Sequence, residues 1–211
     1  MLQSPSTILI LAPHTDDGEF GCGGSMALWL EQRHNVHYVA FSSCEESVPD
    51  GYARDALVHE VKGATASLGI PPENLRILNF PVRRFDEHRQ AILQHMVDLD
   101  RELNPTLVLC PSTEDLHQDH QVVAREALRA FKRRSVLAYE VPWNNIQFRS
   151  GAFTILEQRH LDAKVDAVSH YLSQQDRSYA SRAFLESQMR FRGTQIGAEF
   201  AETFDIVRWL I

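Results

Sequence analysis

The 211-residue sequence has few cysteines and fewer basic than acidic residues. Its three cysteines, Cys22, Cys44 and Cys110, are an odd number without Cys-x-x-Cys spacing, which argues against a disulfide framework and against a thiolate zinc site. Lys and Arg number 21 against 28 Asp and Glu, so the formal net charge is -7. Non-specific nucleic-acid binding depends on Lys and Arg neutralising phosphates, and we therefore expect no nucleic-acid partner.

The amino-terminal segment lacks the features of a signal peptide or a membrane span. It has no basic region at its start, and its apolar run over residues 8–12 is far shorter than either feature requires. We therefore expect a cytoplasmic protein without a membrane span. An acidic soluble subunit is also compatible with a symmetric homo-oligomer.

The composition that remains is that of an ordinary globular protein, with 44% hydrophobic and 23% charged residues. The length is sufficient for one continuous core. The sequence contains no linker, internal repeat or low-complexity tract that would divide it. We therefore expect residues 1–211 to form a single domain.

Short β-branched and aliphatic runs alternate with longer segments of helical periodicity. Strands are predicted over residues 7–12, 37–43, 75–81, 106–111 and 135–141, and helices over residues 25–33, 54–69, 85–104 and 122–133. Strict alternation implies right-handed crossovers and a mostly parallel sheet with helices on both faces, which is a Rossmann-like α/β fold. The last third predicts strands over 152–156 and 201–208 and helices over 160–172 and 179–191, packed on the same core.

Ligands of such a sheet bind outside the carboxyl ends of its strands, so the loop that follows the first strand is the first candidate site. Residues 12–24 of this loop contain one imidazole, three carboxylates and four glycines. Histidine and aspartate are suitable ligands for zinc, and glycine allows a sharp turn. A dinucleotide site is disfavoured, because the glycines lack Gly-x-Gly-x-x-Gly spacing and carboxylates would repel a pyrophosphate.

A second loop, residues 112–120, also lies between a predicted strand and a predicted helix, and its His117 and His120 flank Asp119. A catalytic zinc ion typically has three protein ligands and one open position. Two ligands from the first loop and one histidine from the second would complete that set. The spacing alone leaves open whether Asp16 or Asp17 is the ligand.

These two loops resemble the signatures of the PIG-L/LmbE-like family of zinc-dependent N-deacetylases. The first signature is a Pro-His-x-Asp-Asp turn followed by Gly-Cys-Gly-Gly, and the second is His-x-Asp-His; both are present here. Supporting similarity runs along nearly the whole chain and includes Glu60 and residues 139–143. The resemblance implies that one zinc ion per chain is bound by His14, Asp17 and His120.

The resemblance also implies an activity: removal of an N-acetyl group from an amino-sugar-containing small molecule of the N-acetylglucosamine type. Metal-activated water would attack the acetyl carbon, with Asp16 as the general base. His117 would stabilise or protonate the reacting group. Asp119 would orient His117 and favour its charged form.

The sequence departs from the family pattern where the sugar is expected to bind. Family members often have a substrate-contacting arginine three residues before the equivalent of Glu60, and this chain has Leu57 there. We therefore predict a different set of substrate-binding residues, namely Arg54, Arg83 and Trp143. Two alternatives remain: an amidase that acts on a larger sugar conjugate, and a non-catalytic α/β module that binds a nucleotide or a sugar.

Overall fold

The computed structural model describes residues 5–211, and its first two-thirds contain the five predicted parallel strands. They are β1 (Thr7–Ala12), β2 (Asn35–Ala40), β3 (Leu75–Ile77), β4 (Leu107–Pro111) and β5 (Ser135–Tyr139). The strand predicted over 75–81 ends at Ile77, where the chain leaves the sheet for the loop that carries Arg83. The whole sheet has the order β3-β2-β1-β4-β5-β7-β6.

The order of the strands reverses direction between β1 and β4. From β1 the chain moves outward through β2 to β3, and it then returns to pair β4 with the other side of β1. The carboxyl ends of β1 and β4 therefore border a crevice at a topological switch point, which is the usual ligand position in such sheets.

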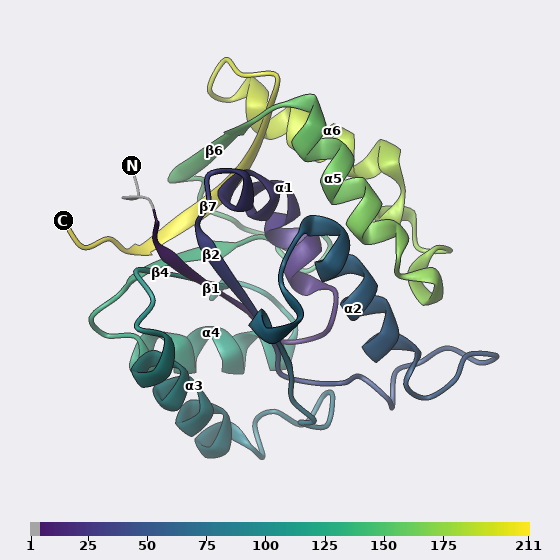
Figure 1. The fold of residues 1–211 in the computed structure, drawn as a ribbon, viewed down its shortest axis with the longest axis vertical. Coiled ribbons are helices and arrows are strands. Elements are labelled where there is room, and N and C mark those ends of the chain that lie inside the picture. The colour runs from purple at the N-terminus through teal and green to yellow at the C-terminus, as the bar shows by residue number, and fades with distance from the viewer. Residues whose placement is uncertain (1–4) are drawn as a thin grey trace.

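Four helices follow the parallel strands: α1 (Asp17–Glu31), α2 (Ala56–Leu68), α3 (Arg89–Leu103) and α4 (Gln118–Ala130). Figure 1 shows α3 and α4 on one side of the sheet and α1 and α2 on the other. Side chains of β1 alternate between the two layers: Ile8 and Ile10 pack in one core cluster, Leu9 and Leu11 in the other. This two-sided burial explains why β1 is apolar from Ile8 to Ala12.

The last third adds two strands that run antiparallel to their neighbours in the sheet. Strand β7 (Phe200–Arg208) pairs with β5, and β6 (Ala152–Leu156) pairs with β7. Helices α5 (Gln158–Ser169) and α6 (Arg182–Thr194) lie on the side of α1 (Figure 1), with the short 3-10 helices η2 (Leu172–Gln174) and η3 (Ser178–Ala180) between them. The mostly parallel α/β fold is confirmed.

Helix α1 differs from its prediction, because it begins at Asp17 rather than at residue 25. The glycines expected to form a turn lie inside the helix, where they allow close packing. A Cβ atom on Gly18 would lie 2.4 Å from the Tyr38 ring, and one on Gly21 would lie 2.3 Å from the Tyr139 ring. The glycine-rich motif thus seats the first turns of α1 directly on β2 and β5.

Helix α1 is also interrupted at Cys22, whose φ of -150° and ψ of 26° are not helical. The Gly24 N–H donates to Glu202 at 3.0 Å, although a regular helix would direct it to the Phe20 carbonyl. That carbonyl instead accepts from Lys164 Nζ at 2.7 Å, and Lys164 also pairs with Glu202 at 2.7 Å. A buried ion pair from α5 and β7 therefore replaces the hydrogen bond that the helix loses.

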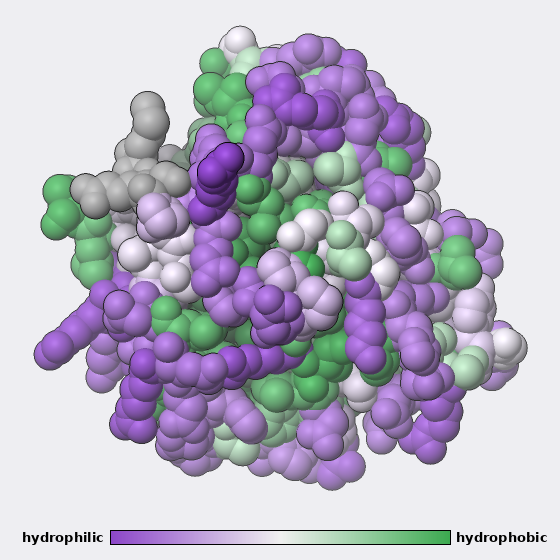
Figure 2. Space-filling model, viewed as in Figure 1, coloured by the Kyte–Doolittle hydropathy of each residue, from purple (hydrophilic) through white to green (hydrophobic). Residues whose placement is uncertain are grey.

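The face drawn in Figure 2 is largely hydrophilic, with apolar side chains visible in the hollow between α2 and α3. Among the helices of residues 5–211, none is both long and apolar enough to cross a membrane.

Candidate active site

Most of the predicted site residues line a cavity of about 290 Å³ at the carboxyl ends of β1 and β4. The first loop contributes His14, Asp16 and Asp17, and the second contributes His117 and His120. The two loops identified in the sequence therefore both line this cavity.

Three donor atoms form a small triangle in this cavity. The distance from His14 Nδ1 to His120 Nε2 is 3.1 Å, and Asp17 Oδ2 lies 3.2 Å from each of these nitrogens. Ligand bonds of about 2.0–2.2 Å to tetrahedral zinc imply ligand atoms roughly 3.3–3.6 Å apart. His14, Asp17 and His120 could therefore hold one zinc ion with little rearrangement.

His117 belongs to a looser set. His14, His117 and His120 each have one ring nitrogen that lies within 4.8 Å of the other two. The triangle with Asp17 is tighter, since none of its sides exceeds 3.2 Å. We therefore assign Asp17 to the ligand set that could bind metal and leave the His117 ring facing the cavity beside it.

Both histidines of the triangle contact a carboxylate through their other ring nitrogen. His14 Nε2 lies 3.0 Å from Asp119, and His120 Nδ1 lies 2.8 Å from Asp115. Such contacts orient a metal-binding imidazole and fix which nitrogen has the free lone pair. Asp115 was missed in the sequence, where its only signal was an additional carboxylate in the second loop.

The electrostatics of the triangle favour a positive charge. Burial lowers the pKa of His14, but Asp17 and Asp119 outweigh burial and raise this pKa to about 9. Burial also lowers the pKa of His120, and Asp17 and Asp115 raise it to about 10. The pKa of Asp17 is held well below its ordinary value by the two histidines, despite burial. A metal ion would supply the positive charge that protons supply in its absence.

Asp16 has a different environment from Asp17. Burial and the negative charge of Asp17 raise the pKa of Asp16 to about 6. Its carboxyl group lines the cavity but contributes no atom to the donor triangle. A carboxyl group with a pKa near neutrality can both accept and return a proton.

His117 is held differently from the expectation. Its Nδ1 accepts the Asp119 backbone N–H at 3.1 Å, which caps the start of α4. Burial, together with the charges of His14 and His120, lowers the pKa of His117 to about 4. A neutral ring whose Nδ1 accepts a hydrogen bond has its proton on Nε2. His117 is thus a neutral donor, and not the imidazolium that the sequence suggested.

The Asp119 carboxylate acts on His14, whereas the sequence analysis paired it with His117. Besides His14, it accepts the backbone N–H groups of Arg83 at 2.6 Å and Phe85 at 3.3 Å. It therefore joins the loop after β3 to the donor triangle. The contact of Asp119 with His117 is made by the Asp119 amide.

A buried polar cluster holds the loop that carries Asp16 and Asp17. The hydroxyl groups of Tyr38 and Tyr171 lie 2.9 and 2.7 Å from the Thr15 carbonyl, and both contact the Glu19 carboxyl. Burial raises the pKa of Glu19 to about 8. No sequence motif indicated this cluster, because its two tyrosines come from distant elements.

The predicted substrate-binding residues have different positions. Arg83 and Trp143 line the cavity. Arg54 does not line it; its side chain is 79% exposed and pairs with Glu45 at 3.4 Å. Arg54 lies just before the start of α2, on the surface of the molecule, which explains this difference.

The last third contributes part of the cavity wall, which sequence reasoning missed. Tyr179 stacks on Trp143 with ring centroids 3.8 Å apart, and Gln174 and Arg177 also line the cavity. These residues lie in and around the short 3-10 helices, outside the two signature motifs.

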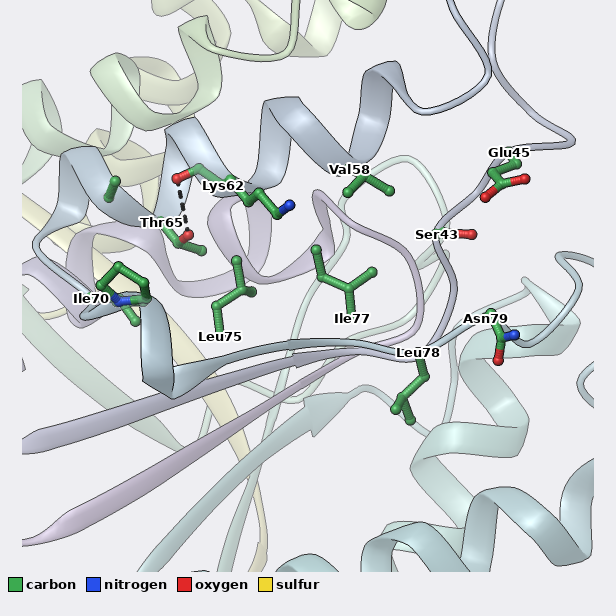
Figure 3. Close-up of a pocket in the computed structure, with 12 residues that line it drawn as sticks. Ser43, Glu45, Val58, Lys62, Thr65, Ile70, Leu75, Ile77, Leu78 and Asn79 are labelled. Carbon is green, nitrogen blue, oxygen red and sulfur yellow. Dashed lines mark hydrogen bonds between the residues drawn. The ribbon is translucent and has the colours of Figure 1, made fainter.

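A larger cavity of about 610 Å³ lies between α2 and β3. Figure 3 shows its aliphatic lining, which includes Ile70, Leu75 and Ile77, with Lys62 and Glu45 as its charged residues. It contains no imidazole, so the residues suited to catalysis are gathered in the smaller cavity.

Solved structures share this fold across almost the entire chain. The conserved protein TT1542 from Thermus thermophilus has a TM-score of 0.82 and 24% identity, covering 98% of this chain and 96% of its own. N,N'-diacetylchitobiose deacetylase from Pyrococcus horikoshii has a TM-score of 0.80 and 18% identity, covering 98% and 87%. GalB, the 4-carboxy-2-hydroxymuconate hydratase from Pseudomonas putida KT2440, has a TM-score of 0.77 and 18% identity, covering 98% of each chain.

The fold therefore occurs both in deacetylases and in a hydratase, and it does not by itself identify a reaction. Sequence comparison is more specific. The model of the PIG-L family, described as GlcNAc-PI de-N-acetylase, matches residues 9–131, which include both loops of the donor triangle and more than half of the chain. The chain belongs to the PIG-L family.

Proposed function

We propose that this protein is a zinc-dependent N-deacetylase, a hydrolase that removes an acetyl group from the nitrogen of an amino-sugar-containing substrate of the N-acetylglucosamine type. The observation that carries the proposal is the triangle of His14, Asp17 and His120 donor atoms, with sides of 3.1–3.2 Å, beside a carboxyl group outside it. Membership of the PIG-L family supports the same reaction.

The donor set suits zinc in its chemistry as well as in its dimensions. Two imidazoles and one carboxylate leave an open position, as in catalytic zinc sites. A zinc ion bound by His14, Asp17 and His120 would supply Lewis acidity, which lowers the pKa of water and polarises a carbonyl group. Asp115 and Asp119 would keep the two imidazoles in the orientation that binding requires.

Asp16 is the group that moves the proton. As water attacks the acetyl carbon, the Asp16 carboxylate accepts a proton from it, because its pKa of about 6 leaves it largely ionised at neutral pH. Asp16 then returns this proton to the amide nitrogen. The C–N bond breaks, and the products are acetate and a free amine.

His117 stabilises the charge that develops on the acetyl oxygen. Its Nδ1 is occupied by the Asp119 amide, so its Nε2–H is the free donor beside the cavity. A donor fixed in advance where charge develops lowers the barrier without a cost in reorganisation. The stacked Trp143 and Tyr179 rings provide an aromatic wall on which a sugar ring can pack.

The test measures metal content and acetate release together. We expect about one zinc ion per chain and acetate release from N-acetyl sugars that stops on chelation and returns with zinc. Asp16→Asn should keep the zinc and lose activity. The exposed Glu114→Gln variant, in the same second loop as the histidines, is the matched control and should keep both.

The other outcomes separate the competing functions. Zinc binding with release only from large sugar conjugates would favour the amidase. No metal after reconstitution, with sugar or nucleotide binding that tolerates Asp16→Asn, would favour the non-catalytic module. Zinc binding without hydrolysis of any N-acyl substrate would contradict the deacetylase proposal, and a hydratase would then be tested because the fold is shared with one.

A further inference from the structure

Two arginines of the cavity have no protein partner for their guanidinium groups. Most arginines of the chain form an ion pair with a carboxylate, as Arg54 does with Glu45 and Arg192 does with Glu140. Arg83 and Arg177 both line the cavity that contains the donor triangle, and within residues 5–211 neither guanidinium has an ion pair or hydrogen bond. Their charges are therefore available to a ligand.

The backbone holds Arg83 in a fixed position. Its φ of 65° lies in the left-handed region that residues other than glycine rarely adopt. Its N–H donates to Asp119 at 2.6 Å, and Asp119 in turn contacts His14. The Arg83 backbone is thereby tied to the donor triangle, although its side chain is exposed.

Arg177 approaches the cavity from the last third of the chain. Its N–H donates to the Gln174 carbonyl at 2.9 Å, in the turn between η2 and η3. Gln174 and Tyr179, on either side of it in sequence, line the same cavity, and Tyr179 is stacked on Trp143. Arg177 thus accompanies the aromatic wall on which the sugar is expected to pack.

The unpaired charges of Arg83 and Arg177 matter for anion binding because the rest of the chain is acidic. The whole chain has a formal net charge of -7, so its field repels an anion. Two unpaired guanidinium groups at the cavity oppose that repulsion locally. A guanidinium group offers a fork of donors that matches the oxygens of a phosphate or a carboxylate.

We propose that the natural substrate is an amino sugar with an anionic substituent, a phosphate or a carboxylate, which Arg83 and Arg177 bind. This inference rests on the proposed deacetylase function and narrows its substrate class. The acetyl group would lie at the donor triangle and the anionic group against the two arginines.

The experiment compares matched substrates. The neutral one is N-acetylglucosamine, the phosphorylated ones are its 1-phosphate and 6-phosphate, and the carboxylated one is N-acetylmuramic acid. We expect at least one anionic sugar to exceed the neutral one in kcat/KM by about tenfold or more, as a charge-assisted hydrogen bond implies. Whether phosphate or carboxylate gives the larger advantage identifies the substituent.

Variants connect that advantage with the two arginines. Arg83→Ala and Arg177→Ala should each reduce the ratio of anionic to neutral kcat/KM by about tenfold, and the lysine variants should lose less because they keep the charge. Arg133→Ala is the matched control. Arg133 is also exposed and without an ion pair in the described chain, but it precedes β5 at the opposite end of the strands. Its removal should leave the ratio unchanged.

Zinc content and thermal stability of Arg83→Ala must equal those of the wild type, since the Arg83 amide supports Asp119. Equal kcat/KM for neutral and anionic sugars, or an advantage that survives in the double alanine variant, would overturn the proposal. If no substrate releases acetate, the deacetylase function fails separately. Calorimetry with glucosamine and glucosamine 6-phosphate then decides the anion site: tighter binding of the phosphate that depends on both arginines supports it, and equal binding overturns it.

Discussion

Residues 5–141 and residues 152–208 share one sheet but differ in strand direction and in what they contribute to the cavity. The first part is parallel, and its loops supply the donor triangle together with Asp16 and His117. The second part is antiparallel and supplies Gln174, Arg177 and Tyr179 to the cavity wall. On the proposed function, the reacting groups thus come from the first part, and the second part supplies groups suited to substrate recognition.

The second part also stabilises the first. Lys164 and Glu202 occupy the break in α1, and the Tyr171 hydroxyl group contacts the Thr15 carbonyl, next to Asp16. The motif-bearing loops are therefore not self-sufficient. Their geometry depends on buried polar side chains more than 140 residues away in sequence.

Among these variants, Lys164→Met is expected to lose the most stability. It removes the ion pair by which the second part supports α1. It leaves the Glu202 carboxylate buried and unpaired and the Phe20 carbonyl without its donor. Removal of one partner of a buried ion pair typically costs about 3–5 kcal/mol. Chemical denaturation should detect the change as a lower midpoint.

The double variant Lys164→Met/Glu202→Gln separates charge from packing. Since the glutamine can still accept from the Gly24 N–H, we expect it to recover part of the lost stability. Arg125→Met, which removes an exposed cation from α4 with no ion pair in the described chain, is the control and should change stability by less than about 0.5 kcal/mol. Equal stability of wild type and Lys164→Met would show that the helix break needs no such support.

His117→Ala tests a chemical contribution of the first part, in contrast to the structural support that the second part provides. We expect zinc content to stay near the wild-type value, because His117 lies outside the donor triangle. Turnover should fall by about 10² to 10³, as for loss of one oxyanion donor. Metal analysis and kcat of the same preparation check both statements. Normal turnover would contradict the assigned role.

The fold of the first part was predictable because its signals are local. Alternating strand and helix periods predicted all five parallel strands, and β1 has the predicted bounds of residues 7–12. The start of α1 was not predictable in this way. Glycine lowers helix propensity, and only the facing rings of Tyr38 and Tyr139 make glycine necessary inside this helix.

The candidate site was predictable to the extent that it lies in contiguous motifs. The two loops contain all the residues of the donor triangle, and the strand ends bring them together. The contacts of Asp115 with His120 and of Asp119 with His14 depend on ring orientations that spacing does not determine. Arg177 and Tyr179 were missed because they lie outside the two motifs, and helical periodicity does not show which residues face the cavity.

Asp115→Asn tests whether metal binding by the first part also depends on a residue that acts through His120. The amide keeps the shape of the side chain but removes the charge that orients the imidazole at 2.8 Å. We expect zinc affinity to fall by about 10- to 100-fold. Competition with a chelating dye measures this change. Excess zinc should restore most of the turnover, whereas a residue that touches the substrate would not be rescued in this way.

Glu31 joins the two parts at the surface, and we expect its substitution to change stability the least. Hydrogen bonds from Arg159 and His160 of α5 lower the pKa of Glu31, at the end of α1, to about 2 from its ordinary 4.5. Because the folded-state pKa is depressed, the contribution of Glu31 to stability is fully present above pH 4.5 and is lost as pH falls toward 2. Wild type and Glu31→Gln should therefore differ slightly in stability at pH 7 and converge as the pH approaches 2. A difference in stability between wild type and Glu31→Gln that does not change with pH would assign the contact to packing. The charge of Glu31 would then contribute nothing to the contact between the two parts.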